Sequence, residues 1–380
     1  MGPNILLDKS ALQSLSQREI YKLAKHYNFV SCPVLLIEIL GDLKKGQTSD
    51  GFSTSEVQQL AQKLLSGGYP CADYHQLVRA SLLGYPVPMT GQVPMAGGRP
   101  VKRGGERGIV FDVSPENRAI LRWRKGEFSE AEKELAGHWR EATRALDLEA
   151  FQRQYKRILK IHKFKNLDNL HRFVSFITSP KDVEEKERVM TALLDEFGTP
   201  QQARGVINRR WRVAGYPGME VFAPYAHYCF KVNLMFQYGV ITGLITTRAT
   251  NRVDIQYFYY APFCLVFCSR DHLHRDLSAV LLRDDQSFVH GDELKADLKQ
   301  LAEQWEAIGD AERREREYEY GSYPPFDEQS VTYRLWRKHM RPWTPGSGNR
   351  AIKMSKEEEQ ALLKKINSLM EGSDAADGRL

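Results

Sequence analysis

The side chains of this sequence that are best suited to chemistry are acids placed among apolar residues. Asp8 ends a run of three apolar residues, and Asp271 comes three residues after the apolar run Cys264–Cys268. Glu38 lies inside Val34–Leu40, which is otherwise entirely apolar. A buried carboxylate costs several kcal/mol unless it is paired, protonated or bound to a metal. We therefore expect a compensating partner for these acids, above all for Glu38.

The order of the predicted elements places these acids together. The first 45 residues have the pattern strand, helix, strand, helix, and Phe263–Ser269 is another β-rich run. In a parallel α/β sheet, ligands bind beyond the carboxyl ends of the strands. Asp8 and Asp271 would both stand at that edge. Glu38 and Asp254, on helices, would point into the same crevice. Clustered carboxylates with no obvious lysine or arginine among them favour a hard cation, Mg²⁺ or Mn²⁺.

The segments that carry these acids resemble the motifs of PIN-domain nucleases. Ile5–Ser10 looks like the opening strand motif, and Cys32–Glu38 resembles the second helix with its acid. Asp254–Tyr260 followed by Leu265–Asp271 is similar to the third acid and the strand-end Ser/Thr-x-Asp of that family. Lys9, directly after the first acid, departs from the usual family pattern.

The resemblance covers roughly residues 3–80 and 220–292. It implies an α/β fold with a PIN-like three-layer core, a central mainly parallel sheet, a helical insertion and C-terminal helices. It also implies phosphodiester hydrolysis, in which one or two ions of Mg²⁺ or Mn²⁺ activate water and neutralise charge. The implied catalytic and metal-binding residues are Asp8, Glu38, Asp254 and Asp271. The implied auxiliary residues are Ser10, Ser269 and Asp42.

Each acid also has a plainer explanation. Asp8 fits a turn residue at the end of a strand, and Asp271 fits a residue that opens the turn before a helix. Asp254, which we place at the start of a helix over Ile255–Tyr260, fits an acid favoured there by the helix dipole. The discriminating observation is whether the four acids converge.

The predicted elements divide the chain into six segments. A helix of charged residues is expected over 292–318, and a last short helix is expected after Ser355. The segment 84–108 is rich in glycine, proline and basic residues and favours a lid, a binding segment or disorder. The segments are 1–83 (first part of the core), 84–114 (flexible basic loop), 115–215 (helical insertion), 216–292 (second part of the core), 293–340 (helical extension) and 341–380 (linker, short helix and tail).

Two basic clusters are candidates for contacts with nucleic-acid phosphates. In the first cluster the basic residues are spaced three or four apart, which places most of them on one face of a helix. The second cluster includes an aromatic residue that could stack on a base. A solvated helix face or a structural role explains them equally well. The first cluster is Arg153, Lys156, Arg157 and Lys160, and the second is Arg209, Arg210, Trp211 and Arg212.

Two further groups lie close to the acids in the sequence. His272 and His274 follow Asp271, and a role at the surface is favoured over contact with a metal or phosphate. The aromatic run Tyr257–Tyr260 is typical of a core.

Composition narrows the class of protein. The chain has 380 residues, 42% hydrophobic and 27% charged, with a formal net charge of +6. These values are normal for a globular protein, and the mild positive charge permits a nucleic-acid partner. No apolar run is long enough for a membrane span, no secretory signal is recognised, and the five cysteines include no Cys-x-x-Cys pair. We expect a cytoplasmic protein.

Three hypotheses follow. The first is a PIN-like endoribonuclease, by family analogy a toxin, an antiviral defence effector or an RNA-processing enzyme, with RNA favoured over DNA. The second is a catalytically degenerate PIN-like protein that binds RNA or assists assembly. The third is an interaction module whose charged helices bind a partner protein. Homo-oligomerisation is left open.

Overall fold

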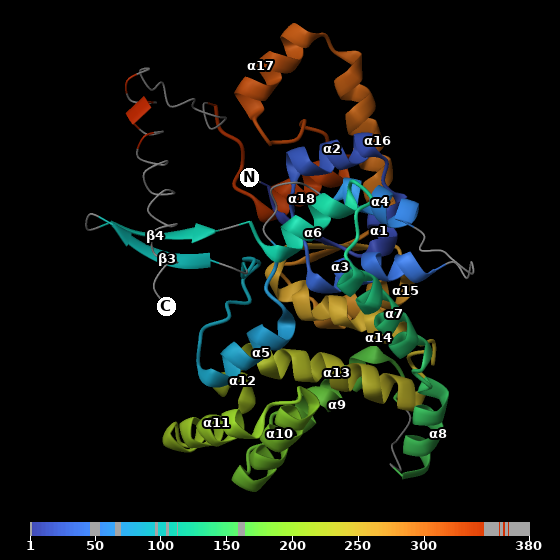
Figure 1. Cartoon of the computed structure of the whole chain (residues 1–380), viewed down its shortest axis with the longest axis vertical. Coiled ribbons are helices and arrows are strands. Elements are labelled where there is room, and N and C mark those ends of the chain that lie inside the picture. The colour runs from blue at the N-terminus through green and yellow to red at the C-terminus, as the bar shows by residue number, and fades with distance from the viewer. Residues whose placement is uncertain are drawn as a thin grey trace.

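The computed structural model describes most of the chain. The described residues are 2–45, 54–64, 70–95, 98–103, 106–111, 113–158 and 164–345, together with residues 357, 360, 361 and 364. Helices dominate, and a small parallel sheet lies near the middle of the molecule (Figure 1).

Four short parallel strands form the sheet. Their order is β2-β1-β5-β6, so that strands from the two ends of the chain are neighbours. Ile5 of β1 pairs with Val266 of β5, and Cys268 of β5 pairs with Val289 of β6. The expected α/β class and mainly parallel sheet are therefore confirmed. The strands are β1 (Asn4–Leu7), β2 (Asn28–Phe29), β5 (Val266–Ser269) and β6 (Ser287–His290).

The helices of the N-terminal segment begin where capping chemistry predicts. Ser16 and Glu19 form a reciprocal capping box at the start of α2, and Pro33 occupies the first turn of α3. Both helices bury apolar side chains in the core. The elements of this segment are α1 (Lys9–Ser14), α2 (Gln17–His26), α3 (Pro33–Leu40), the 3₁₀ helix η1 (Gly41–Lys44), α4 (Thr54–Lys63) and α5 (Tyr74–Leu83).

A β-hairpin lies in the basic segment for which a lid, a binding segment or disorder was expected. β3 (Gly98–Arg103) and β4 (Glu106–Phe111) pair antiparallel, with Gly98 opposite Phe111. This part of the segment is thus two paired strands, which is compatible with a lid or a binding segment. In Figure 1 the hairpin projects from the side of the molecule.

The middle of the chain is helical throughout. Helices α9, α8 and α5 pack against α13, which forms a bridge across the lower half of the molecule (Figure 1). The helices are α6 (Pro115–Trp123), α7 (Glu130–Arg144), α8 (Leu148–Ile158), α9 (Leu167–Thr178), α10 (Val183–Glu196), α11 (Gln201–Val213), α12 (Met219–Phe222) and α13 (Pro224–Thr242).

Asp254 is the last residue of α14 (Asn251–Asp254) and directly precedes the 3₁₀ helix η2 (Ile255–Phe263). The helix expected over Ile255–Tyr260 is therefore present; it is a 3₁₀ helix, and it continues to Phe263. Every residue of the aromatic run Tyr257–Tyr260 is buried, which confirms the prediction of a core role.

The C-terminal helices pack on the N-terminal ones. α16 (Gly291–Ala307) contacts α1, α2 and α18 (Val331–His339). The single charged helix expected over 292–318 is two helices, because the chain turns at Ile308 and Gly309 before α17 (Asp310–Tyr320). α15 (His272–Leu281) follows β5. Most of the helix expected after Ser355 lies outside the described residues. Among the helices that are described, none has the length and apolarity needed to cross a membrane.

Candidate functional site

Asp8 stands at the carboxyl end of β1 and caps α1. Its side chain accepts hydrogen bonds from the Ala11 amide at 2.8 Å and from the hydroxyls of Ser10 and Ser269 at 2.8 and 2.7 Å. It is 4% exposed. The capping role explains the fixed position of this carboxylate, and the serines, two of the predicted auxiliary residues, hold it from both sides.

His274 is a component of the site that the sequence did not favour. Its side chain is fully buried, and its Nδ1 lies 2.7 Å from the Ser269 hydroxyl and 3.4 Å from Asp8 Oδ2. Nε2 donates to the backbone oxygen of Asp254 at 2.8 Å. The expectation of a surface role was wrong, because His274 faces the sheet from the first turn of α15.

Asp8 and His274 form a buried ion pair. Burial would lower the pKa of His274, but the hydrogen bond to Asp8 and the charges of Asp8 and Asp254 raise it to about 9. Burial would raise the pKa of Asp8, but His274 and the other donors lower it. At neutral pH the carboxylate is therefore ionised beside an imidazolium.

Glu38 approaches from α3 and is held by Tyr257 of η2. The Tyr257 hydroxyl donates to Glu38 Oε2 at 2.6 Å, and the Lys9 amide donates to that hydroxyl at 3.3 Å. The pKa of Glu38 is raised by burial, with smaller contributions from the charges of Asp8 and Asp42, while Lys9 and Tyr257 act in the opposite direction. Glu38 thus has the compensating partner that its apolar surroundings demanded.

Asp254 is the least compensated acid of the group. Its Oδ2 is buried and has no hydrogen-bond partner among the described residues. Burial raises its pKa to about 7, and the charges of Asp271, Glu38 and Asp8 add to this effect while His274 opposes it. The charges of the other three predicted acids therefore act on Asp254.

Asp271 caps α15 by accepting a hydrogen bond from the Leu273 amide at 2.7 Å. It follows β5 as Asp8 follows β1, and these two strands are neighbours. The plainer explanations of Asp8 and Asp271 thus describe their local hydrogen bonds correctly. Asp254 makes no capping hydrogen bond.

Asp42 lies in an ion-pair network. It is fully buried and pairs with Lys9 Nζ at 2.6 Å and with Arg140 of α7 at 2.7 Å. Arg140 also donates to the backbone oxygen of Gly41 at 2.9 Å. Two protein cations, Lys9 and Arg140, therefore balance the charge of Asp42.

The carboxylates suit a hard cation in their donor chemistry. Carboxylate oxygens are preferred by Mg²⁺ and Mn²⁺, and Asp254 supplies a buried oxygen without a partner. In the part of the chain that the structure describes, no three His, Cys, Asp or Glu side chains are already arranged around a common metal position. Binding an ion would require movement of side chains, since the protein's own hydrogen bonds now hold three of the acids.

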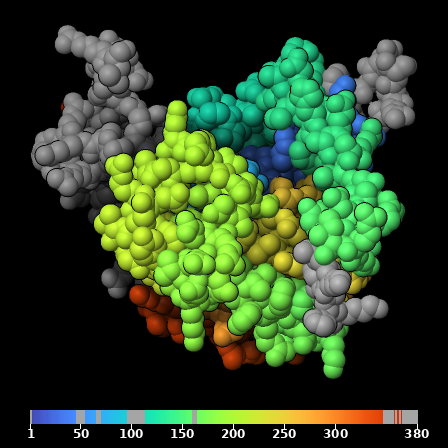
Figure 2. All heavy atoms as spheres, turned by 90° about the horizontal axis from the view of Figure 1, so that it is seen from below, coloured from blue at the N-terminus to red at the C-terminus, as the bar shows by residue number. Residues whose placement is uncertain are grey.

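A hollow opens between the helices that carry the basic clusters. In Figure 2 its walls are the green chain of α7 and α8 and the yellow-green chain of α9 to α11, and its floor shows the dark blue of the N-terminal segment and the gold of the chain after α13. α8 and α11 lie on opposite sides of this hollow (Figure 2). The acids come from segments that form this floor.

The basic clusters divide into exposed and buried members. On α8, Arg153, Lys156 and Arg157 are exposed, and Lys160 lies outside the described residues. On α11, Arg209 and Arg212 are exposed.

Two predicted nucleic-acid contacts have structural roles. Trp211 is 3% exposed and donates from Nε1 to the Pro217 oxygen at 2.8 Å. Arg210 donates to the Leu82 oxygen at 3.0 Å and lies over the Phe222 ring. The prediction that Trp211 stacks on a base was wrong, because its apolar ring is part of the core.

Comparison with protein-family models, with curated protein sequences and with solved structures gave no match to this chain. Functional assignment therefore depends on the geometry of the site.

Proposed function

We propose that this protein is a metal-dependent endoribonuclease with a PIN-like catalytic centre. The observation that carries the proposal is Asp254, whose buried Oδ2 has no hydrogen-bond partner among the described residues and whose pKa is raised by burial and by the charges of Asp271, Glu38 and Asp8. An uncompensated carboxylate is costly in a folded protein, and active sites are where such strain is retained. Its presence at the carboxyl edge of the sheet, where α/β proteins bind ligands, supports a catalytic role.

The ligands of Mg²⁺ or Mn²⁺ would be Asp8, Glu38, Asp254 and Asp271. A bound ion would supply an activated water and neutralise charge on the phosphate. The chain's own residues orient the acids: Ser10 and Ser269 fix Asp8, and Tyr257 fixes Glu38. Asp254 Oδ2 has no hydrogen-bond partner among the described residues, so a ligand bound through this atom would displace none.

The substrate proposed is RNA. Helices α8 and α11, which form opposite walls of the hollow in Figure 2, carry exposed arginines that could hold phosphates on either side of a bond to be cleaved. RNA is chosen over DNA on the family resemblance alone. A toxin or antiviral defence effector is the biological role proposed, again by that resemblance, and a cytoplasmic location goes with it.

A second candidate function is that of a catalytically degenerate RNA-binding or assembly protein. One observation favours it: His274 already supplies a positive charge next to Asp8, and no preformed metal cluster is found among the described residues. An internal imidazolium can satisfy an acidic centre without any metal.

A cleavage assay with Asp254→Asn separates the two candidates. Labelled RNA and single-stranded DNA are incubated with the protein in Mg²⁺, Mn²⁺ or chelator. Asp254→Asn removes the negative charge of this side chain. Because Asp254 Oδ2 makes no hydrogen bond among the described residues, the substitution breaks none there, and the fold should be retained. Asp285→Asn is the matched control, because Asp285 is exposed, pairs with Arg283 and precedes β6 at the opposite edge of the sheet.

The nuclease proposal expects metal-dependent RNA cleavage that Asp254→Asn lowers at least a hundredfold and Asp285→Asn leaves unchanged. Cleavage that persists in chelator, or in Asp254→Asn, would exclude the proposed mechanism. Tight RNA binding without cleavage in any metal would support the degenerate protein instead.

A further inference from the structure

A second concave site lies at the other end of the molecule from α8 and α11. It is a cavity of about 470 Å³ between α2, the end of α16, α17 and the segment that follows α17. This volume is within the range of small-molecule sites. None of its lining residues belongs to the carboxylate group described above.

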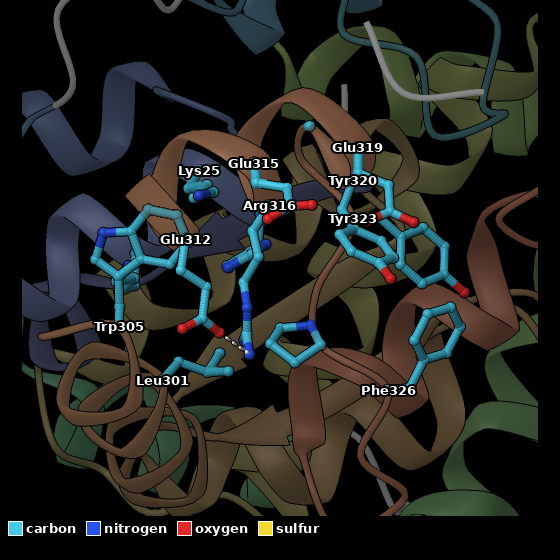
Figure 3. Close-up of a pocket in the computed structure, with 14 residues that line it drawn as sticks. Lys25, Leu301, Trp305, Glu312, Glu315, Arg316, Glu319, Tyr320, Tyr323 and Phe326 are labelled. Carbon is cyan, nitrogen blue, oxygen red and sulfur yellow. Dashed lines mark ion pairs between the residues drawn. The ribbon is translucent and has the colours of Figure 1, made fainter. Parts of the chain in front are cut away.

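Aromatic rings form two opposite walls of this cavity. Trp305 lies on one side, and Tyr320, Tyr323 and Phe326 lie on the other, with Glu312 and Arg316 between them (Figure 3). Phe326 is 56% exposed, although its ring is in contact with those of Tyr320 and Tyr323. An exposed phenylalanine in a cavity offers apolar surface for a flat ligand to cover.

Two lysines of α2 bring positive charge to the Trp305 side. Lys22 Nζ lies 4.1 Å and Lys25 Nζ 3.5 Å from the centroid of the Trp305 ring. Lys25 also pairs with Glu317 at 3.4 Å. Lys22 is 3% exposed and has no ion pair or hydrogen bond with the described residues. Two ammonium groups on one ring repel each other, and the deeper one has no direct ion pair among the described residues.

The pKa of Lys22 reflects this environment. Burial, together with the charges of Lys25 and Arg313, lowers it to about 8, while Glu317 and Glu306 act in the opposite direction. A bound anion would remove this penalty, because it would supply the missing counter-charge. The side chain is thus poised to receive a negatively charged group.

The acids of the cavity point to the rest of the ligand. Glu312 is neutralised by Arg316, as the dashed line in Figure 3 marks. Glu315 and Glu319 also line the cavity, near the tyrosines. Carboxylates accept hydrogen bonds, so this part of the cavity suits the N–H and O–H groups of a base or a sugar. A simple anion would be repelled here.

We propose that this cavity binds a mononucleotide, with its phosphate beside Lys22 and Lys25 and its base against the rings of Tyr320, Tyr323 and Phe326. Stacking of a base on aromatic rings tolerates any base, so the donor groups of the base edge set the preference through Glu315 and Glu319. The site is separate from the carboxylate centre and does not require that centre to be catalytic.

Equilibrium binding to the full chain tests this proposal. The probes are AMP and UMP, with adenosine, ribose 5-phosphate and inorganic phosphate as partial ligands, and the readouts are calorimetry and the fluorescence of tryptophan. Both nucleotides should bind saturably at micromolar to submillimolar concentration. Adenosine and ribose 5-phosphate should each bind more weakly than AMP.

Two substitutions separate the two halves of the ligand. Lys22→Met should weaken AMP about tenfold or more and leave adenosine unchanged, because only a charge-assisted contact is lost. Phe326→Ala should weaken AMP and adenosine alike and is tolerated by the fold, since Phe326 is half exposed. Lys299→Met is the control, because Lys299 is an exposed lysine of α16 paired with Glu303.

The proposal is overturned if neither nucleotide binds at millimolar concentration. It is also overturned if binding is unaffected by both Lys22→Met and Phe326→Ala while circular dichroism shows that the variants are folded. If inorganic phosphate and ribose 5-phosphate bind as tightly as AMP, and Lys22→Met alone weakens them, the base contributes nothing and the cavity is an anion site instead. Cleavage of RNA is measured in parallel, so failure here is distinguishable from failure of the nuclease proposal.

Discussion

At the scale of single residues, Asp254 combines a buried carboxyl group with an Oδ2 atom that has no hydrogen-bond partner among the described residues. Its pKa, raised to about 7 by burial and by the neighbouring acids, means that the folded protein resists its ionisation. Asp254→Asn should therefore stabilise the fold while abolishing metal-dependent cleavage. Thermal unfolding at pH 8, where the carboxylate is ionised, should show a midpoint roughly 1–2 °C higher for each kcal/mol gained. A lower midpoint at that pH would show that Asp254 has a structural partner.

The His274 pair predicts a dependence of stability on pH. The pKa of His274 is about 9 in the folded protein, above its ordinary value of 6.5, so the folded state holds an extra proton between these values. Stability from this group is fully present below pH 6.5 and is lost as pH rises through 9. Urea unfolding of the wild type should show the decline, and His274→Gln should flatten it. An unchanged pH profile in that variant would rule out the pair as its source.

At the scale of elements, Arg140 connects α7 to η1 through the buried Asp42. Arg140→Met removes one of two cations that balance this carboxylate and should destabilise the fold by up to about 3 kcal/mol, with Lys9 limiting the loss. Arg144→Met is the control, since Arg144 is an exposed arginine near the end of the same helix. Equal effects of the two substitutions in urea unfolding would contradict a specific ion pair.

Local chemistry determined which elements were predictable. The capping box at Ser16 and the second one at Ser129 place the starts of α2 and α7 correctly, because both groups of each box are near in sequence. The apolar runs that end near Asp8 and Asp271 predict β1 and β5 and their shared edge. The break at Gly309 was missed, because the charged pattern continues through it.

Long-range pairing determined what could not be predicted. Asp42 has the spacing of a metal ligand, but its partner Arg140 lies 98 residues further along the chain. His274 has no sequence signal for burial except its place one turn after Asp271, and only the sheet packed against α15 shows which way it faces. Trp211 was predicted to stack on a base because its sequence neighbours are arginines. Its large apolar ring is equally suited to burial in the core, where the structure places it.

At the scale of the whole molecule, the hollow between α8 and α11 predicts where nucleic acid is held. Exposed arginines on both walls would contact phosphates. Each lost contact should reduce the slope of the logarithm of the binding constant against the logarithm of salt concentration by about one. RNA binding is measured as a function of salt with Asp254→Asn as the background, so that no cleavage occurs. Arg153→Gln with Arg157→Gln on α8, and separately Arg209→Gln with Arg212→Gln on α11, should each weaken binding and reduce the slope by about one to two.

A matched pair at the far end of the molecule gives this prediction its control. Arg314 and Arg337 are exposed arginines of α17 and α18, away from the hollow in Figure 1, so changing both to glutamine alters the net charge equally. If RNA lies in the hollow, this control keeps the wild-type slope while both wall variants lose part of it. An equal loss in all three double variants would mean that binding follows net charge alone, and the acids on the floor would then have no substrate held above them. A loss confined to one wall would place the RNA along that helix and leave the other to a different role.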